Sequence, residues 1–347
     1  MRRGLMGWTE ADLPLAVLKQ RLSRVQDCLK GQGLGGLVLY TNLARPAAVS
    51  FLTGFTPYWS EGLLLVPAAG DPVFATALSK RVSEWIRSVM PIGSIENTPQ
   101  PAAAIGRRLT AADVRRVGVL ELDLLPAAQA AALTATDAVA LEDATDLFRT
   151  VRMRVDAAEI ALVRRANELA RQCLETVDRG GDARAMMADI EARARLAGAE
   201  EVFVGIAPDL ARSTAFLRSD RLGALGARFA IRLSLSLKGA WVRRTITLGR
   251  VPEAQAKLAA ADAAFARALV SPSPADALKA LEEHFPGTLT AWSLEACVGS
   301  YPLEVVARSG GSGTFSGNLP VSVVSAQGEL DGLPWLGAGP VIGEAQP

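Results

Sequence analysis

The chain has 347 residues; half of them are hydrophobic, and 37 Lys and Arg residues nearly balance 36 Asp and Glu residues for a net charge of +1. This length predicts two domains, and without an excess of positive charge a nucleic-acid partner is not expected. The single histidine, His284, disfavours most metal-dependent, serine and cysteine hydrolases, because these enzymes use imidazole as a ligand or a base.

The expected lack of a targeting signal and the cysteine usage together predict a cytoplasmic protein. No apolar run approaches the about 18 residues that a membrane-spanning helix needs. Glu10 and Asp12 follow the N-terminal Met-Arg-Arg too soon for a secretory signal. Cys28, Cys173 and Cys297 form no CxxC pair, which fits a reducing compartment and predicts no zinc framework. We therefore expect no membrane partner.

The first 145 residues alternate between expected helices and strands, which is typical of a small α/β domain. An amphipathic helix over 13–29 places Leu18, Leu22, Val25 and Leu29 on one face, with charged residues between them. The other expected elements are strands over 37–40, 63–66, 72–77 and 117–120, and helices over 80–88 and 126–133.

A domain boundary is expected near residues 146–156, where Ala-rich segments give way to a charged stretch. Asp156 and Glu159 resemble a capping box at the start of a long helix that ends before residues 180–181. The elements expected after it are a helix over 183–197, strands over 202–206, 229–237 and 243–248, an Ala-rich helix over 252–269, a shorter helix ending at His284, and short strands such as 321–324 in the last 60 residues.

Two glycine motifs favour loops over phosphate sites. Gly31, Gly33 and Gly36 satisfy G-x-G-x-x-G, but they follow a helix and precede a strand, which reverses the order of the dinucleotide fingerprint. Residues 310–313 lack the Lys of a phosphate-binding loop.

Two polar features have both a structural and a functional interpretation. His284 lies in the last turn of an expected helix, where an imidazole interacts favourably with the helix dipole. Arg243 and Arg244 beside Trp241 suit an anion or a planar ligand, although a solvated strand edge is the simpler explanation.

Several short segments stand out by their sequence and by their order along the chain. They are Leu-Gly-Gly-Leu-Val-Leu at 34–39 with Phe-Leu-Thr-Gly-Phe at 51–55, Phe-Arg-Thr-Val-Arg at 148–152 before Glu159 and Ile160, Lys-Gly-Ala-Trp at 238–241, Arg-Thr-Ile-Thr-Leu-Gly at 244–249, and Val298-Gly299 with Tyr-Pro-Leu-Glu at 301–304. This order resembles the creatinase, prolidase and aminopeptidase P superfamily. The resemblance implies an α/β N-terminal creatinase-like domain over 1–147, followed by an α+β pita-bread domain over 148–347.

The same resemblance implies which positions would hold metal ions. Active metallopeptidases of the superfamily bind two ions through two Asp, one His and two Glu side chains. The matching positions here are Arg232 or Ser234 for the first Asp, Trp241 or Val242 for the second, Ala296 for the His, Ser325 for the first Glu, and residues 336–339 for the last.

None of these positions holds a carboxylate or an imidazole, so we expect no metal and no other cofactor. Hard divalent cations need several oxygen or imidazole ligands, and an Arg in their place repels them by about 4 kcal/mol per unit charge at about 4 Å. The metal-free, creatinase-like branch uses a His as proton shuttle, but the matching stretch 209–216 offers only Ser213 or Thr214.

The expected function is that of a metal-free, catalytically inactive peptidase-like protein that keeps its scaffold for binding or assembly. The candidate residues for a small anionic ligand are Ser213, Arg232, Trp241, Arg243, Arg244 and Glu304. Two alternatives stay open. One is a metal-independent hydrolase or lyase of a small amide that uses Glu304 with Ser213, and the other is an Xaa-Pro peptidase whose ligands this alignment misses.

The resemblance also implies an assembly. In the superfamily, the N-terminal domain of one subunit often completes the site of its partner. A homodimer is therefore expected, with Phe55, Tyr58 and Trp59 as candidate cross-subunit residues, and a heterodimer with an active relative is the alternative.

Overall fold

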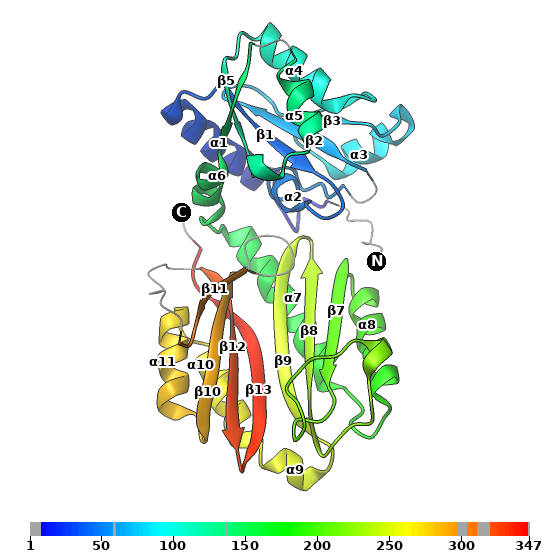
Figure 1. Cartoon of the computed structure of the whole chain (residues 1–347), viewed down its shortest axis with the longest axis vertical. Coiled ribbons are helices and arrows are strands. Elements are labelled where there is room, and N and C mark those ends of the chain that lie inside the picture. The colour runs from blue at the N-terminus through cyan, green and yellow to red at the C-terminus, as the bar shows by residue number, and fades with distance from the viewer. Residues whose placement is uncertain (1–7, 58–59, 136–137, 297–303, 311–319, 346–347) are drawn as a thin grey trace. The chain divides into compact units, whose positions relative to one another are not determined.

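The computed structural model describes residues 8–57, 60–135, 138–296, 304–310 and 320–345, and the chain divides into two compact units, Met1–Arg154 and Val155–Pro347 (Figure 1). The division follows helix α6 (Thr145–Arg152), later than the expected boundary between residues 147 and 148. The reason is packing: Phe148 of α6 meets Phe51 edge to face, with ring centroids 6.2 Å apart, and so belongs to the first unit.

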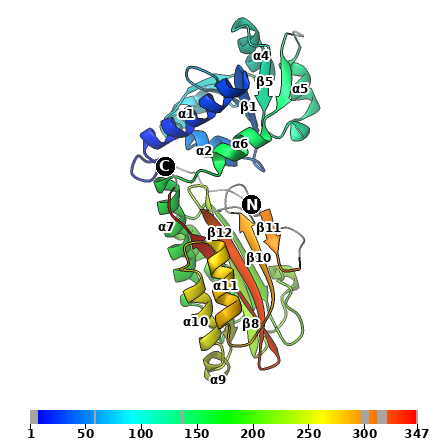
Figure 2. The same cartoon turned by 90° about the vertical axis from the view of Figure 1, so that its left-hand side faces the viewer.

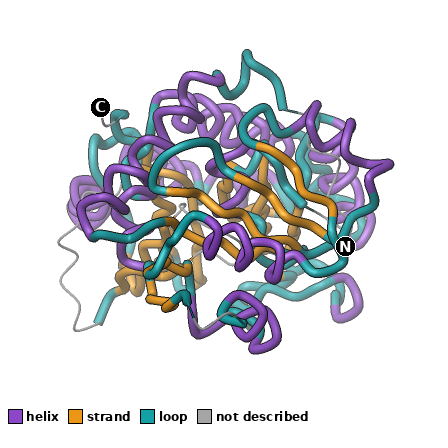
Figure 3. Tube along the Cα trace, turned by 90° about the horizontal axis from the view of Figure 1, so that it is seen from above, coloured by secondary structure: helices purple, strands orange, loops and turns teal. Residues whose placement is uncertain are grey.

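The first unit is built on a six-stranded mixed sheet in the order β4-β3-β2-β1-β5-β6. Figure 3 shows its strands lying between helices on either side. The strands are β1 (Gly36–Thr41), β2 (Gly62–Pro67), β3 (Val73–Thr76), β4 (Ser94–Asn97), β5 (Arg116–Val119) and β6 (Ala140–Asp143). The α-helices are α1 (Leu15–Gln32), α2 (Ala47–Thr53), α3 (Ser83–Val89), α4 (Pro101–Ala111), α5 (Ala127–Leu133) and α6.

Both faces of this sheet are buried because the central strands are apolar on both sides. Val38 packs with Ile105 and Leu109 of α4 in one cluster. Leu37 and Leu39 point to the opposite face by strand alternation and are fully buried as well. Near-continuous apolar strands are typical of a sheet covered by helices on both faces.

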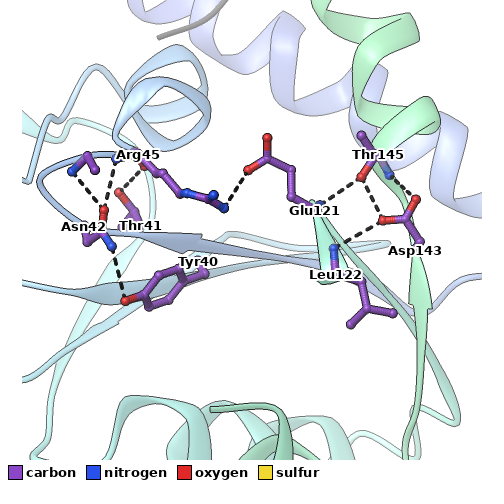
Figure 4. A network of polar contacts seen from close by, with 9 residues as sticks. Tyr40, Thr41, Asn42, Arg45, Glu121, Leu122, Asp143 and Thr145 are labelled. Atoms are coloured by element: carbon purple, nitrogen blue, oxygen red, sulfur yellow. Dashed lines mark hydrogen bonds and ion pairs between the residues drawn. The ribbon is translucent and has the colours of Figure 1, made fainter. Parts of the chain in front are cut away.

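A polar network fixes the carboxyl ends of the parallel strands β1, β5 and β6 (Figure 4). Glu121 lies there with a left-handed φ of 52°. The backbone N–H of Glu121 donates to the hydroxyl of Thr145 at 2.9 Å, and the carboxylate of Glu121 pairs with Arg45 at 3.2 Å. Thr145 also donates to Asp143 at 2.8 Å, which lowers the pKa of that carboxyl. These groups satisfy one another, so the network reads as structural support.

The second unit is a seven-stranded antiparallel sheet in the order β11-β10-β12-β13-β9-β8-β7. Figures 1 and 2 show its helices gathered on one face. The strands are β7 (Glu201–Ala207), β8 (Arg228–Leu237), β9 (Ala240–Gly249), β10 (Thr288–Ala296), β11 (Glu304–Arg308), β12 (Val321–Leu330) and β13 (Leu333–Ile342). The helices are α7 (Ala157–Glu175), α8 (Ala183–Leu196), α9 (Pro252–Ala256), α10 (Ala259–Ala268) and α11 (Pro274–His284).

The core of this unit lies between the sheet and α7 and α8. Asp156 caps α7 by accepting the backbone N–H of Glu159 at 2.9 Å, as the sequence predicts. Ile160 and Val163 of α7 pack in one cluster with Leu233 and Leu235 of β8. Alternate residues of β8 and β9 therefore point to the opposite face of the sheet, away from these helices.

The two halves of the second sheet meet between β13 and β9. Among the described residues, a single ladder position, Ala338 with Thr245, joins them. Side chains reinforce the junction: Thr247 both donates to and accepts from the backbone of Leu336 at 2.8 Å. Arg228 donates to the carbonyl oxygens of Leu330 and Leu333 at 3.1 and 3.0 Å, and its burial lowers its pKa.

Several sequence expectations need correction. The single helix expected over 252–269 is two helices, α9 and α10. The strands expected to be short near the C-terminus are long, since β12 and β13 have ten residues each.

In the described part of the chain, no helix is both long and apolar enough to cross a membrane.

Candidate functional site

The β8–β9 hairpin positions the charged side chains that the sequence singled out. Its register places Ser234 opposite Arg243 and Arg232 opposite Thr245. These four residues share the face of the sheet opposite α7 and α8. We call this face, with Glu295 of β10 and Ser325 of β12, the open face. The hairpin is acid-free: residues 228–250 hold six Lys or Arg and no Asp or Glu.

A buried carboxylate fixes the turn of this hairpin. Lys238 and Gly239 both adopt left-handed φ values, 52° and 81°, which a two-residue type I′ hairpin turn requires. Glu200 accepts their backbone N–H groups at 2.9 and 2.6 Å and the hydroxyl of Ser236 at 2.7 Å. Burial raises the pKa of the Glu200 carboxyl, and the three hydrogen bonds oppose that shift.

The centre of the open face is an ion pair between Arg243 and Glu295. Arg243 also donates from Nε to the Ser234 hydroxyl at 3.0 Å, and Ser325 donates to the other Glu295 oxygen at 3.4 Å. The side chains of Arg243 and Glu295 are only 9% and 6% exposed. Because β13 and β12 lie between β9 and β10, this pair bridges the two halves of the sheet.

Arg232 lies one step along the face and is held by an aromatic ring. Its guanidinium carbon is 4.0 Å from the centroid of Phe216, and its Nε contacts the Thr245 hydroxyl at 3.5 Å. Phe216 belongs to the β7–β8 loop (208–227), which Figure 1 shows crossing in front of the sheet. Gly205 of β7 permits this approach, because a Cβ there would lie 3.3 Å from the Cβ of Phe216.

Two further aromatic side chains occupy the same face. Phe203 pairs with Ser234 across β7 and β8, and Trp241 pairs with Ser236 across β8 and β9. Their rings stack at 5.9 Å with an interplanar angle of 26°. Trp241 is buried and Phe203 is partly exposed.

The residues of the open face do not fit a pair of divalent cations. The carboxylate that reaches its centre, Glu295, is already neutralised by Arg243. Across the described ranges, no group of three or more His, Cys, Asp or Glu side chains is arranged to hold a metal ion. Two guanidinium groups at neighbouring positions repel a cation, whose binding needs several anionic or neutral oxygen ligands.

The remaining ligand candidates do not assemble with Arg232, Trp241 and Arg243. Arg244 points to the helical face, where its Nη1 donates to Asn167 of α7 at 2.8 Å and burial lowers its pKa. Ser213 is exposed in the β7–β8 loop, and its hydroxyl accepts the N–H of Ala215 at 3.1 Å.

The other predicted positions lie on edges or in the core. The backbone of Glu304 lies on the edge strand β11, opposite Ala296. Phe55, a candidate for contact with a second subunit, is only 1% exposed and packs between Phe74 and Trp85 inside its own unit. Residues 58 and 59 lie outside the described residues.

Sequence reasoning named Arg243 as a ligand candidate but missed Glu295 of the central cluster. The hairpin register places Arg243 opposite Ser234. Glu295 stands beside the expected Ala296, and the signal that could have found it is that it is a lone acid within an apolar strand.

Comparison with known proteins places this geometry in a known fold. Residues 21–154 match the Creatinase/Prolidase N-terminal domain family. Dipeptidase PepE from Mycobacterium ulcerans superposes with a TM-score of 0.61 at 20% identity, covering 95% of this chain and 94% of that one. The prolidase from Pyrococcus horikoshii OT3 gives a TM-score of 0.66 at 15% identity, over 94% and 96% of the two chains.

A third solved structure agrees with these two. The X-Pro aminopeptidase from Thermotoga maritima MSB8 gives a TM-score of 0.68 at 14% identity, covering 91% of this chain and 95% of that one. No curated protein sequence matches the chain. At these identities the structural likeness establishes the fold: an α/β creatinase-type N-terminal domain and a pita-bread domain, as the sequence predicts.

Proposed function

We propose that this chain, which has the pita-bread fold of the creatinase, prolidase and aminopeptidase P superfamily, is a metal-free and catalytically inactive member. In this proposal it retains the scaffold for binding or assembly, and its ligand is a small anion at the open face. Fold and chemistry are separable, because the sheet and helices shape a site whereas a few side chains supply its reactivity.

The Arg243–Glu295 ion pair is the observation that carries the proposal. In the superfamily to which the sequence is similar, this region of the sheet holds cations between carboxylates. Here a guanidinium of the chain itself neutralises Glu295, and Ser234 and Ser325 complete the hydrogen bonds. An ion pair of this kind neutralises Glu295, the carboxylate that the described residues bring to the centre, and breaking it would strand a buried charge.

The charge of the hairpin favours an anion over a cation or a neutral ligand. Residues 228–250 hold Arg228, Arg232, Lys238, Arg243, Arg244 and Arg250 without an acidic residue. Glu295 neutralises one of these charges on the open face. Arg232 adds a second guanidinium to this face, and arginine is suited to carboxylate and phosphate groups.

Metal content and turnover test the proposal together. The purified full-length chain is incubated with Mn²⁺, Co²⁺ or Zn²⁺ and desalted. Its metal content is then measured by inductively coupled plasma mass spectrometry, and its peptidase activity is measured with a panel of Xaa-Pro dipeptides. We expect no stoichiometric metal and no hydrolysis above the buffer control. About two ions per chain, or turnover that Glu295→Gln abolishes, would contradict the proposal.

Assembly belongs to the same proposal and has its own measurement. We propose a homodimer, with a heterodimer containing an active relative as the alternative partner. Light scattering across a concentration series gives the mass of the assembly against the 36.5 kDa of one chain. The mass of a monomer at every concentration would contradict the proposed homodimer.

A further inference from the structure

Two neighbouring parallel strands of the first unit, β1 and β5, send the chain to opposite faces of the sheet. After β1 the chain enters α2, which packs against α1, and after β5 it reaches α5, which packs with α4. Figure 2 shows α1 and α5 on opposite sides of β1. In open α/β sheets, ligands bind at the carboxyl ends of strands whose connections diverge in this way.

Four polar side chains gather at this end of β1. We infer that Tyr40, Asn42, Glu61 and Gln129 form a binding site for a small polyol or sugar with hydroxyl groups on neighbouring carbons. They come from β1 and the loop after it, from the residue before β2, and from α5. The site belongs to the first unit and not to the open face, so the inference goes beyond the proposed function and does not depend on it.

The carboxylate of Glu61 is the centre of the site. The hydroxyl of Tyr40 donates to one of its oxygens at 2.7 Å, and Nε2 of Gln129 donates to the other at 3.1 Å. These two neutral donors hold the carboxylate in one orientation. Each carboxylate oxygen accepts two hydrogen bonds, so each retains one acceptor position for a ligand. Glu61 and Gln129 are partly exposed, which gives a ligand access from solvent.

Asn42 adds an amide that the backbone holds in place. Its Oδ1 accepts the N–H groups of Ala44 and Arg45 at 2.9 and 3.0 Å, so its Nδ2 faces the phenol oxygen of Tyr40 at 3.4 Å (Figure 4). That contact is longer than an ordinary N–H···O hydrogen bond, and a ligand oxygen replaces it at little cost. The neighbouring Arg45–Glu121 pair is matched within itself and takes no part.

The donors and acceptors of the site select the class of ligand. A group that binds the carboxylate of Glu61 must donate, and a group that binds the amide nitrogens of Asn42 and Gln129 must accept. A hydroxyl does both, whereas an ammonium only donates and a carboxylate only accepts. Because the other three side chains surround one carboxylate, they suit two adjacent hydroxyls better than a single one.

Nuclear magnetic resonance titration of the ¹⁵N-labelled full-length chain with D-ribose tests this inference. The side-chain amide signals of Asn42 and Gln129 report on the site itself. We expect ribose to shift both signals in a saturable manner. Methylammonium, which only donates, and acetate, which only accepts, are each expected to bind at least about tenfold more weakly.

Three variants assign the binding to these side chains. Glu61→Gln is expected to weaken ribose binding about tenfold, because hydrogen bonds to a charged group are the strongest in the site. Gln129→Ala is expected to weaken it about threefold or more. Gln20→Ala, at an exposed position of α1, is the matched control and is expected to leave the ribose affinity unchanged. Circular dichroism checks folding, and Gln129→Ala remains the test if Glu61→Gln does not fold.

The inference is overturned if ribose leaves both amide signals unchanged, or if methylammonium or acetate binds as tightly as ribose. It is also overturned if Gln129→Ala and Gln20→Ala bind ribose alike. Each of these results leaves the metal content and the peptidase assay untouched, so failure of this site and failure of the proposed function are distinguishable.

Discussion

Arg243 and Glu295 lie 52 residues apart in the chain and meet in the interior of the second unit. Each keeps hydrogen bonds to a serine, so the charged atoms retain polar partners after leaving water. A buried pair of this kind contributes little net stability compared with a hydrophobic pair of similar shape, but removing one member is costly because the other charge stays buried.

A double-mutant cycle measures this asymmetry. Arg243→Met and Glu295→Gln are each expected to lower the free energy of unfolding by about 3–5 kcal/mol, whereas the double variant loses much less than the sum. Urea denaturation followed by circular dichroism gives the three values. Strictly additive losses would show that the two side chains do not interact in solution. Arg171→Met, on an exposed helical pair with Glu168, is the control and is expected to cost less than about 1 kcal/mol.

Glu200 gives the second unit a pH dependence of definite sign. Burial raises the pKa of this carboxyl above its ordinary value of 4.5, so the folded chain holds the proton more tightly than the unfolded chain. The contribution to stability is full below that ordinary value and is lost as the pH rises through the folded pKa.

Glu200→Gln is therefore expected to gain stability relative to the wild type as the pH rises from 4 to 8. Thermal unfolding of both proteins at each pH gives the difference in Tm. A difference that stays constant, or that moves in the opposite direction, contradicts the assignment. Glu253→Gln, at an exposed position of α9, is the control for general effects of removing an acid.

At the scale of elements, the last residue of β9, Gly249, lies so close to the backbone of α9 that a side chain does not fit there. A Cβ on Gly249 would lie 2.3 Å from the backbone nitrogen of Gln255 in α9. Gly249→Ala is expected to destabilise the chain by about 1–3 kcal/mol, because backbone must move. Gly31→Ala, in helix α1 with nothing within 4 Å, is expected to stabilise it by about 0.5 kcal/mol through helix propensity. Urea titration compares the two, and equal effects would mean that the crowding is absent.

Elements with strong periodicity could be predicted from the sequence. The alternation of apolar and polar residues in β8 predicted its strand, and the spacing in α7 predicted its helix, because both have one face in the core. The strands β4 and β6 have four residues each, lie at sheet edges and are half exposed, so no pattern marks them. Helix α4 was missed as well, although its buried residues Ile105 and Leu109 have the i, i+4 spacing of one helix face.

The central ion pair could not be predicted in the same way. Arg232 and Ser234 were identified by their place on β8, and the hairpin turn fixes what lies opposite them. The approach of Glu295 depends on the strand order β10-β12-β13-β9, which is a property of the whole sheet and not of any local pattern. Side chains from distant strands meet here only through the tertiary fold.

For the molecule as a whole, the fold is the one seen in solved peptidase structures. The chain matches those structures over more than nine-tenths of its length. The scaffold is thus maintained, and among the described residues the centre of the second sheet holds the Arg243–Glu295 ion pair. Under the proposed function, the chain binds or assembles and does not hydrolyse.

Anomalous diffraction from crystals of the full-length chain soaked in Mn²⁺ tests this claim most directly. Data collected at the manganese absorption edge reveal any bound ion independently of activity. We predict no anomalous peak on the open face, and electron density for the Arg243–Glu295 pair in its place. Two strong peaks there, within about 2–2.3 Å of protein oxygen or nitrogen atoms, would contradict the proposed loss of the metal site.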